Sequence, residues 1–186
     1  MAVWKDAKSM PLPWGAGHYV VGPFKIVHHT TEGSSAEGAF EAYDKDHWIP
    51  HFTVDAQQIY QHLDTLVSAT ALQHPAGTVE TNRSSAIQFE VVGFAGRPKD
   101  RATLKNVALL CRWIEATHGV PPVWPSGYPD PPIDGRDPGH HNRSVVNWTT
   151  KGGHYGHCHV PNNVHWDRAY TKDETDFIMS VAAGDV

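Results

Sequence analysis

Two periodicities of apolar residues divide the chain into predicted strands and helices. The stretch "FKIVHHTT" at 24–31 is rich in β-branched residues and follows Gly22-Pro23, which predicts a strand. Successive side chains of a strand point to opposite faces, so His28 should lie on one face and His29 on the other. The same reasoning predicts further strands at 51–55, 58–63 and 86–96.

Helical spacing of apolar residues predicts three helices. The longest, at 102–119, ends at a glycine, which is a common helix stop. Its apolar stripe consists of Leu104, Val107, Ala108, Cys111 and Ile114. A helix at 34–47 should begin with a capping box made by Ser34 and Glu37, and a last helix is predicted at 173–183. Strands and helices are mixed without strict alternation, which favours one sheet with helices packed on it.

Length and proline content set the domain organisation. The chain has 186 residues, which is the size of one domain, so we expect a single α/β domain over 1–186 with a core at about 20–183. Seven of its fourteen prolines fall between 121 and 138. The segment 121–150 is therefore predicted to be a loop with stiff extended parts, either a wall of a binding cleft or an inert surface loop.

Charge and hydropathy exclude several partners. The net charge of −5 and the pI near 6.2 argue against nucleic-acid binding. The first residues lack the apolar core of a signal peptide, and apolar residues nowhere run together for the length of a membrane span. We expect a soluble monomer that is made in the cytoplasm and has no membrane association. Two cysteines cannot form a disulfide framework.

Histidine is unusually frequent and concentrates near the C-terminal end. The chain has fourteen histidines, and "GHYGHCHVPNNVHWD" at 153–167 contains four of them. A catalytic zinc site takes three protein ligands and leaves a fourth position for water. The near pair of ligands could be His157 with His159, His157 with Asp167, or His159 with His165. The distant ligand could be His28, His29 or His51, and spacing alone does not choose among them.

Four motifs together resemble a known family. In this order and at these separations, "IVHHTTEG", "HFTVD", "AIQFEVVG" and "GHCHVPNNVHWD" resemble the zinc-dependent N-acetylmuramoyl-L-alanine amidases of type 2. That family includes phage amidases of the lysozyme type and the peptidoglycan recognition proteins. The resemblance covers about residues 20 to 180. It implies the amidase fold of the peptidoglycan recognition proteins, with a central mixed sheet flanked by helices, and one Zn²⁺ ion.

The resemblance also implies a role for each site residue. It places the zinc ligands at His28, which ends the first strand, at His157 of the "GH" pair, and at Asp167. Glu90 falls where the family has a glutamate that acts as general base and then general acid. His165 takes the position of a basic residue, usually lysine, that stabilises the oxyanion.

Two departures from the family pattern matter. An ordinary histidine titrates near pH ~6.5, so the residue at 165 need not carry the permanent charge of a lysine. Relatives with a Tyr-His-Phe stretch use its tyrosine in catalysis, whereas Pro50 precedes His51 here. No catalytic tyrosine is expected at that position.

The function implied by the resemblance is hydrolysis of peptidoglycan. The scissile bond would join the lactyl group of N-acetylmuramic acid to the L-alanine of the stem peptide, so both glycan strand and stem peptide would be bound. Without a signal peptide, the expected role is that of a phage endolysin that reaches the wall after release. Two alternatives stay open: a zinc peptidase that cuts within the stem peptide, and a module that binds peptidoglycan without cutting it.

Overall fold

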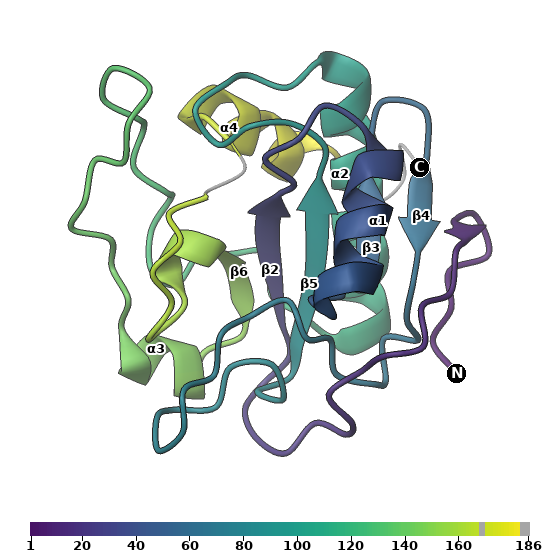
Figure 1. Cartoon of the computed structure of the whole chain (residues 1–186). Helices are drawn as coiled ribbons and strands as arrows, with labels where there is room; N and C mark the ends of the chain where they lie inside the picture. The colour runs from purple at the N-terminus through teal and green to yellow at the C-terminus, as the bar shows by residue number, and fades with distance from the viewer. Residues whose placement is uncertain (168–169, 183–186) are drawn as a thin grey trace.

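A single mixed sheet organises the structure, which is a computed structural model that describes residues 1–167 and 170–182. Within these residues the sheet has six strands in the order β1-β4-β3-β5-β2-β6 (Figure 1). The strands are β1 Lys8–Ser9, β2 Lys25–Thr30, β3 Phe52–Val54, β4 Ile59–Gln61, β5 Ala86–Val91 and β6 Gly153–Gly156. Only β3 and β4 pair antiparallel, and the other neighbours are parallel. This arrangement confirms the predicted fold class.

Helices cover both faces of the sheet. They are α1 Ala36–Asp46, α2 Arg101–His118, α3 Val145–Thr150 and α4 Lys172–Ser180, and a short 3-10 turn spans His157–His159. Figure 1 shows α1 in front of β5 and β3, with α2 and α4 behind the sheet. Among the described helices, none is long and apolar enough to cross a membrane.

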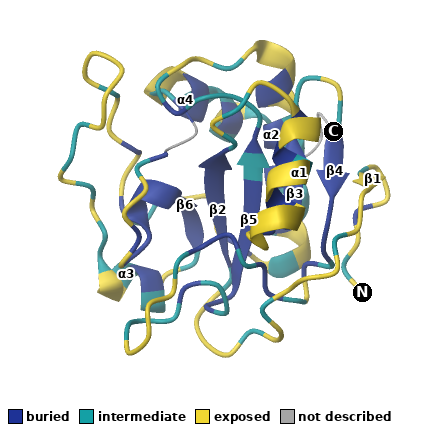
Figure 2. Cartoon of the chain, viewed as in Figure 1, coloured by how far each residue is buried: buried dark blue, intermediate teal, exposed yellow. Residues whose placement is uncertain are grey.

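The strand alternation separates two apolar cores. Ile26 and Phe89 belong to the core beneath α2 and α4, whereas Val27 packs with Trp148 and Tyr155 on the opposite face. A third cluster, which includes Ala39, Tyr43 and Ile49, lies under α1. Strand β2, between β5 and β6, is buried along its whole length, as the dark blue colour in Figure 2 shows. Because both faces are covered, the consecutive histidines His28 and His29 point into different layers.

The helix ends follow the polar residues beside them, with one correction. The capping box of Ser34 and Glu37 is wrong by one position, because Ser35 is the extended residue whose side chain accepts from the N–H of Gly38. Helix α2 begins after Asp100 and stops at Gly119, as predicted; this glycine has φ 66 and donates its N–H to the carbonyl of Glu115. Helix α4 ends at Ser180 rather than at 183, and residue 183 lies outside the described residues.

Three elements were not predicted: β1, β6 and α3. Helix α3 occupies the end of the predicted loop, which therefore stops at its N-cap Ser144. Strand β6 reads "GHYG", a poor strand sequence that is stabilised by parallel pairing with β2. Glycine is required at position 153, because it has φ +137 and a Cβ there would lie 2.5 Å from the carbonyl oxygen of Val123.

Candidate metal centre and catalytic site

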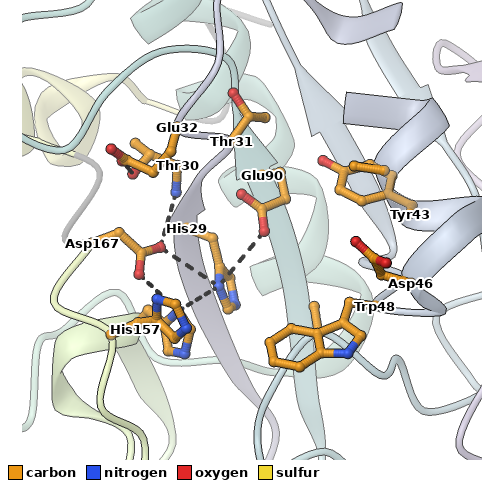
Figure 3. A pocket seen from close by; sticks show the side chains of 13 residues that line it. His29, Thr30, Thr31, Glu32, Tyr43, Asp46, Trp48, Glu90, His157 and Asp167 are labelled. Carbon is orange, nitrogen blue, oxygen red and sulfur yellow. Dashed lines mark hydrogen bonds and ion pairs between the residues drawn. The ribbon is translucent and has the colours of Figure 1, made fainter. Parts of the chain in front are cut away.

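Three side chains converge at the carboxyl ends of β2 and β6. His29 is the second-last residue of β2, His157 follows β6 directly, and Asp167 comes from the next loop. The Nδ1 atoms of the two histidines are 3.1 Å apart. Asp167 Oδ1 lies 2.8 Å from His157 Nδ1, and its Oδ2 lies 3.8 Å from His29 Nδ1. Figure 3 shows all three pointing toward one position.

This donor set fits a zinc ion. Tetrahedral zinc with ligand distances of about 2.0–2.2 Å separates neighbouring ligand atoms by about 3.3 Å, and the three observed separations bracket that value. Two imidazole nitrogens and one carboxylate oxygen leave a fourth position for water or substrate. All three residues are buried, and Thr30 fixes Asp167 by donating its backbone N–H to Oδ2.

The electrostatics of the three residues are coupled. Burial lowers the pKa of His29 to about 3, so its ring is neutral and able to bind a metal. Burial acts to raise the pKa of Asp167, but His157, His29 and the Thr30 N–H outweigh it and hold that pKa below its usual range. Burial likewise acts to lower the pKa of His157, yet Asp167 raises it. A metal would therefore displace the proton that His157 shares with Asp167.

Glu90 stands beside this cluster on the neighbouring strand. It pairs in register with His29, and its Oε1 lies 3.8 Å from His29 Nδ1. Its other oxygen, Oε2, is buried and lacks a hydrogen-bond partner among the described residues. Burial raises the pKa of Glu90 well above its ordinary value, and the charges of Asp167 and Glu32 add to this effect. A carboxyl whose pKa is raised in this way is suited to taking up and returning a proton.

A cleft of about 610 Å³ opens above these residues. Tyr43, Asp46 and Trp48 form the wall opposite His157 and Asp167 (Figure 3). His165 lines the mouth, where its ring stacks on that of His157 with a centroid separation of 5.3 Å. The cleft therefore combines a convergent donor set, a carboxyl of raised pKa and an aromatic rim.

A family profile described as N-acetylmuramoyl-L-alanine amidase matches residues 22–170, most of the chain. The chain belongs to this amidase family. A search of curated proteins returned no significant match.

Several solved structures share the fold of this amidase family member. The Staphylococcus aureus hydrolase AmiA, solved in complex with its ligand, has a TM-score of 0.61 at 16% identity over 96% of this chain and 82% of that chain. The N-acetylmuramoyl-L-alanine amidase LysC from Clostridium intestinale has a TM-score of 0.58 at 12% identity, covering 95% and 98%. An AmpD derivative gives 0.56 at 13% identity, covering 95% and 96%.

The structure corrects one expected ligand of this amidase. His28 does not lie with His157 and Asp167, because it projects from the opposite face of β2 into the core under α2. There its Nδ1 is 3.0 Å from the hydroxyl of Tyr170, and its Nε2 is 2.9 Å from His154 Nδ1. His29 occupies the place that the resemblance assigned to His28. His157, Asp167, Glu90 and His165 all line the cleft.

The remaining histidine candidates are occupied elsewhere. The buried Nδ1 of His159 accepts the backbone N–H of Gly156, which turns this ring away from the ligand position. His51 Nδ1 accepts the N–H of Gln88, and its Nε2 lies 2.8 Å from the carbonyl of Val67. The described residues that line the cleft include none from 121–150.

Sequence reasoning missed Tyr43, Asp46 and Trp48 as cleft residues, and Asn163 beneath it. The first two belong to α1, and the helical pattern places tyrosine among apolar core positions rather than at a site. Trp48 is exposed in the structure, but the sequence alone does not reveal exposure, so neither Trp48 nor Asn163 carried a signal that marked it.

Proposed function

We propose that this chain hydrolyses the amide bond between N-acetylmuramic acid and L-alanine in peptidoglycan, with a zinc ion held by His29, His157 and Asp167. The observation that carries this proposal is the convergence of three buried ligand atoms beside Glu90 in the cleft of an amidase family member. The donor set and its spacing support zinc over magnesium or calcium, which prefer oxygen ligands.

The chemistry divides between the ion and the chain. When bound, zinc supplies a Lewis acid that polarises the amide carbonyl and lowers the pKa of the attacking water to about 7. Glu90 takes a proton from that water and delivers it to the departing nitrogen. A C–O bond forms and the C–N bond breaks, giving the lactyl carboxylate and the free amine of L-alanine. The raised pKa of Glu90 suits both proton transfers.

His165 would donate an N–H to the oxygen of the polarised carbonyl. Its exposed ring at the mouth of the cleft, stacked on His157, supports this role. Trp48 lies edge-on to His165 at a centroid separation of 6.5 Å, so the aromatic rim continues from the ligand to the solvent. We propose that this rim holds the substrate while the far wall at Tyr43 and Asp46 bounds it.

The biological role that we propose is lysis of the bacterial wall by a monomeric, phage-type enzyme. The family of the chain supports peptidoglycan as its partner. One solved structure of the same fold is described as an endolysin amidase from Clostridium intestinale, with a TM-score of 0.58 at 12% identity over 98% of this chain and all of that one.

Mass spectrometry of digested wall tests the reaction. Purified peptidoglycan is incubated with the zinc-loaded protein and, in parallel, with Glu90→Gln as the matched inactive control. We expect intact stem peptides that begin with L-alanine from the wild type alone. Shorter peptides would identify a zinc peptidase instead. Wall that sediments with the protein but releases nothing would identify a binding module.

A further inference from the structure

One buried amide touches the ring of His157 from behind. Asn163 Oδ1 lies 3.0 Å from His157 Nε2, the ring nitrogen that faces away from His29 and Asp167. Asn163 is 2% exposed, so water does not compete for this contact. It comes from the loop between His157 and Asp167, four positions before the carboxylate.

The orientation of the Asn163 amide follows from its other partners. Oδ1 accepts the backbone N–H of Gln73 at 2.9 Å. Nδ2 donates to the carbonyl oxygens of Gln73 and Pro161, both at 3.0 Å. A backbone N–H can only donate and a carbonyl can only accept, so an exchange of the amide oxygen and nitrogen would break three hydrogen bonds. The oxygen therefore faces His157.

This orientation determines the protonation of His157. An amide oxygen only accepts, so His157 Nε2 must carry a hydrogen. In the neutral ring the other nitrogen, Nδ1, then has its lone pair free toward His29 and Asp167. We infer that Asn163 is the positioning residue of the metal centre, which sets both the tautomer and the ring angle of His157. The inference rests on the proposed function in taking His157 as a metal ligand.

The same amide joins two walls of the site. Gln73 belongs to the segment that provides Ala71 to the cleft, and its carbonyl also accepts from the hydroxyl of Thr81. Asn163 thus ties the loop that carries Asp167 to a segment held independently. His29 has no comparable support, because its Nε2 lacks a hydrogen-bond partner among the described residues. Asn163 therefore orients His157, and His29 has no residue in an equivalent position within the described part of the chain.

Zinc affinity, measured by competition with a chelator, tests the inference. Asn163→Ala removes the acceptor and should weaken zinc binding by about 10- to 100-fold. The matched control is Asn82→Ala. Asn82 clamps the backbone of Leu72 in the same way, accepting its N–H at 3.0 Å and donating to its carbonyl at 2.7 Å, while touching no ligand. The control should lower the melting temperature and leave zinc affinity unchanged.

A second variant separates acceptor from scaffold. Asn163→Asp keeps an oxygen toward His157 but loses the two donated hydrogen bonds to Gln73 and Pro161. We expect wild-type or tighter zinc binding together with a lowered melting temperature. The inference fails if Asn163→Asp binds zinc as weakly as Asn163→Ala, or if Asn82→Ala weakens zinc binding as much as Asn163→Ala does.

NMR of nitrogen-15 histidine in the zinc-loaded wild type reads the tautomer without any variant. A proton on His157 Nε2 is expected, and a proton on Nδ1 would overturn the inference. The inference about Asn163 and the proposed amidase function can fail independently of each other. Wall that resists digestion while zinc affinity still depends on Asn163 would refute the amidase and leave the inference standing. Undiminished zinc binding in His157→Ala would refute the inference.

Discussion

Two histidine clusters lie on opposite faces of the same sheet, built from neighbouring residues of β2 and of the β6 region. The cleft cluster consists of His29, His157 and Asp167, and the core cluster of His28, His154 and Cys111. In each cluster the potential ligand atoms lie within 4.8 Å of one another. Residue type and proximity therefore do not distinguish a metal centre from a packed core.

Hydrogen bonds of the core cluster use every imidazole nitrogen. Glu115 accepts from His154 Nε2 at 2.9 Å, so His154 Nδ1 is left to accept from His28 Nε2, also at 2.9 Å. His28 Nδ1 then accepts the hydroxyl of Tyr170 at 3.0 Å. Arg112 forms an ion pair with Glu115, at the end of this series of hydrogen bonds. Burial lowers the pKa of both histidines, which keeps them neutral as this order requires.

The cleft cluster, in contrast, has buried polar atoms that make no hydrogen bond within the part of the chain that the structure describes. His29 Nε2 and Glu90 Oε2 are buried without hydrogen-bond partners among the described residues, and two carboxyl groups adjoin the histidines. Burial also raises the pKa of the Cys111 thiol in the core cluster, so that sulfur is held protonated and a poor ligand. Buried polar atoms without partners among the described residues, together with two adjoining carboxyl groups, therefore distinguish the cleft cluster from the core cluster.

The largest expected effect comes from replacing the two consecutive histidines, His28 and His29, one at a time. His29→Ala removes a ligand and should abolish stoichiometric zinc and reduce wall hydrolysis by at least about 100-fold. His28→Gln should retain one zinc per folded chain, since the imidazole nitrogens of the core cluster are already engaged in hydrogen bonds. Elemental analysis and a turbidity assay measure both. Retained zinc in His29→Ala with loss in His28→Gln would reverse the comparison.

The confusion of His28 with His29 shows what the sequence can determine. The strand, its alternation and the apolar stripe of α2 are local patterns, and all three were predicted correctly. Which face of β2 meets the cleft depends on the register with β5, where His29 faces Glu90. Register is a tertiary property, and an error of one residue exchanges the two faces.

The site residues that the sequence did not reveal show a second limit. His157 and Asp167 were predicted from one motif. Asn163 instead contributes through a contact with Gln73, which lies 90 positions away in the sequence. A pattern within one segment does not contain such contacts. Strand β6 is a similar case, because pairing with β2 outweighs its glycines.

Next in size is the loss of the proton carrier beside the cleft cluster. Glu90→Gln keeps the shape but cannot accept a proton, so hydrolysis should fall by about 10²- to 10⁴-fold. Zinc content should stay at one per chain, because Glu90 is not a ligand. Steady-state rates and elemental analysis on the same sample check this. A variant that loses its zinc as well would place Glu90 among the ligands.

Breaking the core cluster should affect stability rather than chemistry. Glu115→Ala leaves Arg112 and His154 without their shared carboxylate, which should cost about 3–5 kcal/mol of unfolding free energy in urea. Glu41→Ala, at an exposed position of α1, is the control and should change it by less than about 0.5 kcal/mol. Zinc bound per folded chain should not change. Loss of zinc in Glu115→Ala would mean that the two clusters are coupled.

The smallest effect distinguishes the clusters by the sign of a pH dependence in the metal-free protein. The pKa of His154 is lowered by burial, so its stabilising contribution is present above the unfolded value of about 6.5 and is lost as pH falls. The pKa of His157 is raised by Asp167 despite burial, so its contribution is present below about 6.5 and is lost as pH rises through the folded pKa.

Replacing each of these histidines by glutamine exposes the difference. The destabilisation caused by His154→Gln should be greater at pH 7.5 than at pH 5, and that caused by His157→Gln greater at pH 5 than at pH 7.5. The two differences should therefore have opposite signs. Urea unfolding in the presence of a chelator measures both. Parallel pH profiles would show that the two clusters hold their protons alike, and the distinction between a closed core and an open metal centre would then rest on geometry alone.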